Sequence, residues 1–161
     1  MSDTPLHKPL PVITDQTRPF WTAAKEGRLV LQKCQRCGQF NFHPKPWCIE
    51  CGSRELHWTD ARPSGTVYSF TVSRTVAMNY PGWQADLPLL LCLIDLDDGA
   101  RLYAQVTNCK PQDLRIGMRV GVHFESISEE AGYIPPIFQQ YPCKISASAM
   151  IYIVIASNIK S

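Results

Sequence analysis

The chain has 161 residues and a mass of 18.2 kDa, with 45% hydrophobic and 19% charged residues. This is the size of one domain or of two small ones, and the composition excludes wholesale disorder. No apolar run reaches the roughly 20 residues that a membrane-spanning helix needs. The first residues also lack the basic start and apolar core of a secretory signal. We therefore expect a cytoplasmic protein without a membrane partner.

The net charge of +2 is distributed unevenly and indicates two modules. Residues 1–63 carry nine Lys or Arg against six Asp or Glu (+3), whereas residues 64–143 carry five against eight (−3). We place the boundary at the break Arg62-Pro63-Ser64-Gly65. The expected organisation is a flexible lead-in over residues 1–17, a helix and metal ribbon over 18–63, a barrel over 64–143, and a tail over 144–161 to which no function is assigned.

A short helix is expected at the start of the first module. Thr17 can cap it, and Gly27 can end it in a left-handed conformation. A helix of this length is not stable alone, so Phe20 and Trp21 are expected to dock on the rest of the protein.

Four of the seven cysteines fall within eighteen residues, as Cys34-x2-Cys37 and Cys48-x2-Cys51. Each pair places two thiolates on a tight turn, and two facing pairs make a tetrahedral four-sulfur cage. The spacing predicts zinc, and rubredoxin-type iron also fits this geometry. A closed cage leaves no position for water, so the site is predicted to be structural. An odd cysteine count without an export signal argues against a disulfide framework.

The segment between the two cysteine pairs allows two interpretations. It contains Phe40, Phe42, His43, Lys45 and Trp47. These residues either form an exposed aromatic and basic loop that grips a partner, or pack beneath the ribbon against the helix. His43 could replace one cysteine as a ligand, although four thiolates already fill the site.

The second module is rich in strand signals. Asp98-Gly99 between two apolar runs predicts a hairpin, because both turn positions tolerate a positive φ. A single helical turn is expected over residues 111–114. The predicted strands are Thr66–Val76, Pro88–Leu96, Arg101–Val106, Met118–Ile127 and one near Ile137-Phe138. We therefore predict a mainly β protein in which an N-terminal helix and rubredoxin-like zinc ribbon precede a five-stranded OB-fold barrel, with a small sandwich as the alternative.

Taken together and in this order, the motifs resemble the zinc-ribbon plus OB-fold proteins associated with acyl-CoA metabolism. The similarity covers roughly residues 18–141, and the tail after Tyr141 departs from the pattern. It is carried by Arg18-Pro19-Phe20-Trp21, Leu29 to Cys34, Pro46, Cys48, Cys51-Gly52, Trp58, Ser64 to Thr71, Ile116-Gly117-Met118 and Pro135-Pro136.

The resemblance implies an accessory, non-catalytic subunit that assembles with a thiolase-like or acyltransferase enzyme. In such complexes the chemistry is acyl transfer, thiolysis or retro-aldol cleavage, and some relatives are fused to, or associate with, hydratases. The resemblance further implies that the barrel helps to hold the coenzyme A thioester, while the partner supplies the nucleophile.

Coenzyme A is a polyanion with an adenine ring, so its site is expected to contain basic and aromatic side chains. Arg74, Tyr80 and Trp83 are the candidates, because they lie on the long first barrel strand and in the loop after it, where an OB barrel commonly presents ligand-binding groups. The alternative is that Arg74 is a solvated strand end and that Tyr80 and Trp83 only cover the mouth of the barrel.

Two other functions are considered. A single-stranded nucleic-acid binder would interleave aromatic and basic residues, but residues 88–107 contain one arginine, Arg101, and three aspartates. An independent enzyme would use Cys92 or Cys109. Cys92 lies in an apolar strand, which favours an inert thiol, and Cys109 lies beside Lys110 without a nearby base in the sequence.

Overall fold

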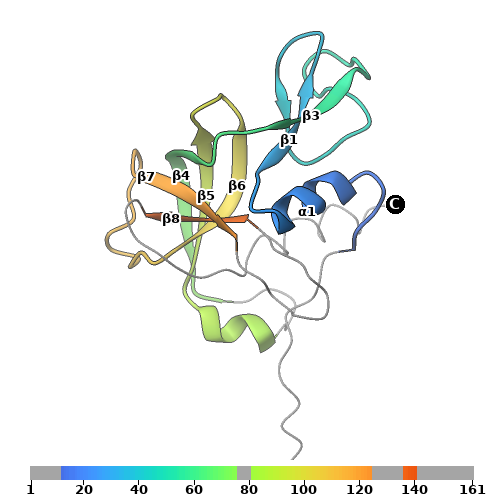
Figure 1. The fold of residues 1–161 in the computed structure, drawn as a ribbon. Coiled ribbons are helices and arrows are strands. Elements are labelled where there is room, and N and C mark those ends of the chain that lie inside the picture. Colours follow the sequence, from blue (N-terminus) through green and yellow to red (C-terminus); the bar gives the residue numbers. More distant parts are fainter. Residues whose placement is uncertain (1–11, 76–80, 125–135, 141–161) are drawn as a thin grey trace, which may run out of the picture.

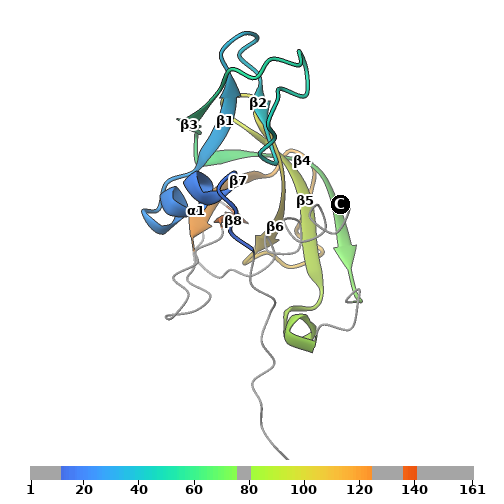
Figure 2. The same ribbon diagram turned by 90° about the vertical axis from the view of Figure 1, so that its right-hand side faces the viewer.

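The computed structural model describes residues 12–75, 81–124 and 136–140 (Figure 1). A helix and a three-stranded ribbon lie at one end of a β-barrel, as Figures 1 and 2 show. The elements are α1 (Arg18–Lys25), β1 (Val30–Cys34), β2 (Phe40–Asn41), β3 (Leu56–Asp60), β4 (Ser64–Ser73), the 3₁₀ helix η2 (Pro81–Asp86), β5 (Leu89–Leu96), β6 (Arg101–Thr107), β7 (Arg119–Phe124) and β8 (Pro136–Gln140). None of the helices in these ranges has the length and apolar character needed to cross a bilayer.

Helix α1 forms where the sequence predicts it, but its first turn is arranged differently. Thr17 occupies the N-cap position without capping the helix through its side chain. Its hydroxyl instead accepts a hydrogen bond from the backbone N–H of Thr14, at 3.1 Å. Gly27, with φ at +73°, ends the helix as expected. Phe20 and Trp21 are 5% and 2% exposed, so the predicted docking of this face is confirmed.

The ribbon is a small antiparallel sheet with strand order β2-β1-β3. Strand β1 pairs with β3 over five residues, from Val30 opposite Asp60 to Cys34 opposite Leu56. Its pairing with β2 covers only two positions. The cysteine-bearing turns therefore extend beyond a short sheet.

Five strands form the barrel, in the order β4-β5-β6-β8-β7. Strand β8 runs parallel to β6 and antiparallel to β7. The ring is closed by short pairings, three residue pairs between β4 and β7 and two between β6 and β8. This is the five-stranded Greek-key topology of an OB-fold, so the predicted OB-fold is found and the sandwich alternative is wrong.

The barrel connections follow the turn signals with two differences. Gly99, with φ at +93°, turns the β5–β6 hairpin, and the Leu96 N–H donates to the Ala100 carbonyl at 2.8 Å. Residues 111–114, predicted as a helical turn, form a simple turn in which the Asp113 N–H donates to the Lys110 carbonyl. Gly65, predicted as part of a break, lies inside β4, where a Cβ would clash with the Asp95 carbonyl.

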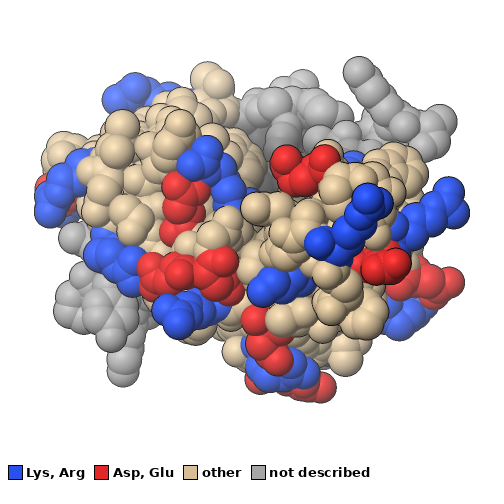
Figure 3. All heavy atoms as spheres, turned by 90° about the horizontal axis from the view of Figure 1, so that it is seen from above, with Lys and Arg blue, Asp and Glu red and all other residues tan. Residues whose placement is uncertain are grey.

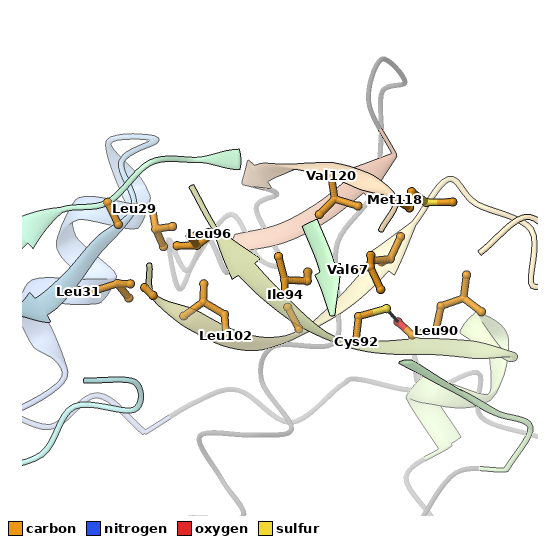
Figure 4. Close-up of a cluster of buried hydrophobic side chains, with 14 of the residues drawn as sticks. Leu29, Leu31, Val67, Leu90, Cys92, Ile94, Leu96, Leu102, Met118 and Val120 are labelled. Carbon is orange, nitrogen blue, oxygen red and sulfur yellow. Dashed lines mark hydrogen bonds between the residues drawn. The ribbon is translucent and has the colours of Figure 1, made fainter. Parts of the chain in front are cut away.

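A single hydrophobic core runs through the barrel and into the base of the ribbon (Figure 4). Alternate residues of β5 point inward, including Cys92 and Ile94 at 0% exposure. Leu29 and Leu31 extend this core toward α1. The buried residues of the ribbon and of the barrel form one continuous core. The domain boundary between residues 63 and 64 therefore stays a prediction. The tail over residues 144–161 lies outside the described residues.

Candidate metal centre and ligand-binding residues

The four predicted cysteine ligands lie together at the outer end of the ribbon. The sulfur atoms of Cys34, Cys37, Cys48 and Cys51 all lie within 4.8 Å of one another. The Cys34–Cys51 and Cys37–Cys48 Sγ atoms are 3.6 and 3.5 Å apart. Four sulfurs about 2.3 Å from a central ion are separated by roughly 3.8 Å along each edge of the tetrahedron. The cluster therefore has the size of a four-sulfur metal site.

The two cysteine turns are built in the same way. The Gly38 N–H donates to the Cys34 carbonyl at 2.9 Å, and the Gly52 N–H donates to the Cys48 carbonyl at 3.0 Å. Both glycines have a positive φ, +75° and +73°, which a side chain would disfavour. The local sequence of each turn therefore sets the positions of its own two sulfur atoms, independently of the other turn.

The thiols of Cys34 and Cys37 differ in acidity, because their pKa values shift in opposite directions. Backbone N–H groups, first that of Cys37, lower the pKa of Cys34 to about 6. For Cys37 the N–H of Gln39 lowers the pKa, but burial and the sulfur of Cys48 outweigh it and raise the pKa to about 12. Four adjacent thiolates repel one another, and a divalent metal ion bound between them would offset part of their negative charge. The six described cysteines are all free.

His43 does not belong to the cluster, which among the described residues consists of the four cysteines. Its ring lies 4.3 Å from the ring of Phe42. Burial, and secondly the charge of Lys45, lowers the pKa of His43 to about 4. The imidazole is therefore neutral at pH 7 and packs as part of the ribbon.

The segment between the cysteine pairs combines the two interpretations. Phe40 and Phe42 pack against the core, and the Phe42 ring centroid lies 6.2 Å from that of Phe20. Trp47 is 51% exposed, and its neighbour Ile49 is 57% exposed. The early part of the segment is structural, whereas its end faces solvent.

Two buried amides hold this segment in place, and sequence reasoning missed both. The backbone N–H of Lys45 donates to Gln32 Oε1 at 2.8 Å. Asn41 Nδ2 donates to the Trp47 carbonyl at 2.9 Å, and Asn41 Oδ1 accepts from the Ile49 N–H at 3.3 Å. The sequence signal for Asn41 is weak: it is a polar residue that lies between two aromatic residues, Phe40 and Phe42.

The structure does not bring the three coenzyme A candidates together on one exposed surface. Arg74 is exposed just after β4, Tyr80 lies outside the described residues, and Trp83 in η2 is only 1% exposed. A hollow of about 260 Å³ lies next to η2. It is lined by Asp86, Pro88, Leu90 and residues 105–109. A ligand role for the three candidates stays a prediction, and for Trp83 it requires the indole to become accessible.

The two remaining described cysteines are poor nucleophiles. Burial raises the pKa of Cys92, which is 0% exposed, to about 12. Burial also raises the pKa of Cys109. Because the thiolate is the reactive form, both groups are protonated and inert near neutral pH.

Comparisons with known proteins match the two modules in order. Residues 21–57 match the family model described as the rubredoxin-like zinc ribbon domain of ChsH2. Residues 58–125 match the C-terminal OB-fold domain of ChsH2.

Similar proteins fall into two size classes. A DUF35 domain-containing scaffold protein of Methanocaldococcus jannaschii is 30% identical over 113 residues, which cover 68% of this chain and 77% of the relative. A probable enoyl-CoA hydratase alpha subunit of Thermomonospora curvata is 33% identical over 70% of this chain. The match spans only 34% of the length of that hydratase subunit.

Solved structures show the same architecture. A chain of the Ltp2-ChsH2(DUF35) aldolase superposes with a TM-score of 0.68 at 28% identity, covering 81% of this chain and 98% of that one. A DUF35 protein from Sulfolobus solfataricus, at 13% identity and a TM-score of 0.50, shows the fold alone. With both modules matched in order and a scaffold relative matched over most of its length, the chain belongs to the DUF35 family, whose members pair a ChsH2-type zinc ribbon with an OB-fold.

Proposed function

We propose that the chain is an accessory, non-catalytic subunit of a cytoplasmic, thiolase-like acyl-CoA enzyme complex. The observation that carries this proposal is the match to the Ltp2-ChsH2(DUF35) aldolase, which covers 98% of the matched chain at 28% identity. Relatives of similar length are described as scaffold proteins, which supports a role in assembly. The partner would perform acyl transfer, thiolysis or retro-aldol cleavage.

The four cysteines would hold one structural zinc ion in this subunit. Their sulfur separations fit a tetrahedral cage, and the match of the surrounding residues to a zinc ribbon model supports zinc. An ion with four protein ligands has no open coordination position, so it supplies rigidity and no chemistry.

A non-catalytic role agrees with the side chains that the structure describes. Cys92 and Cys109 are kept protonated by burial, so neither provides a thiolate. The nucleophile would therefore come from the partner, and this chain would help to hold the coenzyme A thioester. Arg74, Tyr80 and Trp83 remain the candidate contacts, although Arg74 and Trp83 do not line the hollow next to η2 and Tyr80 lies outside the described residues.

The charge pattern of the barrel argues against the nucleic-acid alternative, which assigns strand binding to the OB-fold. Arg101 forms an ion pair with Asp95, and Arg119 forms one with Asp97. Figure 3, the view from above Figure 1, shows basic and acidic side chains interspersed among the described residues of that face. A strand-binding groove would need unpaired cations and exposed aromatics along one track.

Co-expression with a thiolase-like chain encoded next to it tests this function. We expect a stable hetero-oligomer by size-exclusion chromatography with light scattering. We also expect thioester turnover by the complex and none by the isolated subunit. Turnover by the isolated subunit, or the absence of any complex, would contradict the proposal. Oligonucleotide binding whose logarithm falls steeply with the logarithm of salt concentration would support the alternative instead.

A further inference from the structure

The loop that carries the second cysteine pair exposes two large apolar side chains. Trp47 and Ile49, on either side of Cys48, are 51% and 57% exposed, whereas Cys48 itself is 1% exposed. Single exposed apolar residues are ordinary on protein surfaces. Here two of them are separated by one residue that is anchored in the cysteine cluster. We refer to residues 47–49 as the Trp47–Ile49 loop.

The backbone of this loop is held rigidly from behind. The side chain of Asn41, 1% exposed, donates to the Trp47 carbonyl at 2.9 Å and accepts from the Ile49 N–H at 3.3 Å. A single buried amide thus fixes the backbone on both sides of Cys48. Apolar side chains on a fixed backbone lose little entropy on binding, which is the property of an interface anchor.

The surroundings of the loop carry positive charge. Between Gln32 and Glu55 the chain has four Lys or Arg residues against two Asp or Glu residues, an excess of +2 that does not count the four thiolates and their metal ion. No ion pair joins these basic residues, Lys33, Arg36, Lys45 and Arg54, to an acidic residue within the described ranges. Two copies of the chain docking through this loop would bring like charges together, so a second copy is disfavoured.

We propose that the Trp47–Ile49 loop is the anchor with which the ribbon binds its partner subunit. The partner surface would be an apolar socket with an acidic rim, because that surface complements both the exposed side chains and the charge around them. This inference rests on the proposed function and adds to it the place of contact.

The test compares binding of matched variants to the thiolase-like subunit by titration calorimetry. The double variant Trp47→Ser with Ile49→Ser is expected to raise Kd by about 30-fold, equivalent to about 2 kcal/mol. Trp47→Phe alone should retain most of the affinity, since it keeps an aromatic anchor. The control is Ile116→Ser, which removes a 68% exposed apolar side chain elsewhere on the surface. It should leave Kd within about twofold.

Lys45→Glu should slow association, more at low than at high salt.

Zinc content and thermal midpoint are measured on each variant, and both should match the wild type because the changed side chains are exposed. A folded double variant that binds with wild-type affinity overturns the inference. So does a wild-type homodimer that the double variant abolishes, which would make the loop a self-association surface. If the wild type binds no thiolase-like subunit, the proposed function itself fails and this inference falls with it.

Discussion

The barrel and the outer ribbon bury different kinds of side chain. In the barrel, Ile94 and Leu102 are completely buried among other aliphatic residues (Figure 4). In the fully described segment from Gln32 to Glu55, the buried side chains are two amides and two cysteines: Gln32, Asn41, Cys34 and Cys48. Apolar burial can stabilise the barrel, at about 25 cal/mol per Å². Apolar packing of the outer ribbon is limited to partly buried residues such as Phe40 and Phe42, so we expect its structure to depend on the metal.

The largest expected effect comes from removing a metal ligand. Structural zinc contributes about 10–16 kcal/mol to the folding of zinc-finger peptides. Cys48→Ser should therefore lose the zinc and disorder residues 32–55. Metal analysis by mass spectrometry and amide NMR signals of the ribbon measure this. Cys109→Ser, outside the cluster, should keep one ion per chain; a Cys48→Ser protein with full zinc and native ribbon signals would disprove the assignment.

A core truncation should show the opposite pattern. Ile94→Ala removes a completely buried side chain and is expected to cost about 2–5 kcal/mol in the free energy of unfolding by urea. The folded variant should keep its zinc. Ile116→Ala, at a 68% exposed position, should change stability by less than about 0.5 kcal/mol. Equal losses in both variants would mean that burial does not stabilise the barrel as described.

A smaller effect is expected at the start of the barrel. Gly65 faces the backbone carbonyl of Asp95 so closely that an added Cβ would clash with it. Gly65→Ala should separate β4 from β5 locally and cost about 1–3 kcal/mol in a thermal or urea unfolding experiment. Ser69→Ala on the same strand adds no atoms and serves as the control. Unchanged stability of Gly65→Ala would show that the strands can separate without loss.

The smallest effect concerns pH. Arg119, and secondly the Ser64 hydroxyl, lowers the pKa of Asp97. A carboxyl whose pKa is lower in the folded state stabilises the protein above its unfolded pKa of about 3.9. That contribution disappears as the pH falls through the folded pKa. Carboxyl-carbon NMR titration should show Asp97 ionised below pH 3.9, and Arg119→Gln should raise its pKa; an unchanged value would exclude the ion pair as the cause.

Features specified by short-range sequence were predictable. The cysteine spacing and the Asp98-Gly99 hairpin act within a few residues, and each lies where it was expected. The OB-fold was predicted from the order of the expected strands along the chain, and the barrel has this fold. The capping role of Thr17 was wrong because Thr14, an equally local partner, engages its hydroxyl.

The rest depends on long-range packing. Gln32 and Asn41 look like ordinary polar strand residues until the loop folds back over them. The difference between Phe42, which packs on Phe20, and the exposed Trp47 likewise comes from the path of the loop. Alternating polarity cannot reveal such contacts, because their partners lie far away in the sequence or are backbone groups.

Hydrogen exchange of the whole chain, followed by mass spectrometry before and after zinc removal, tests the central claim most directly. If the metal rather than apolar packing holds the outer ribbon, amide protection should be lost over residues 32–55 and retained in β5 and β6. Protection that persists throughout the ribbon of verified zinc-free protein would contradict the account.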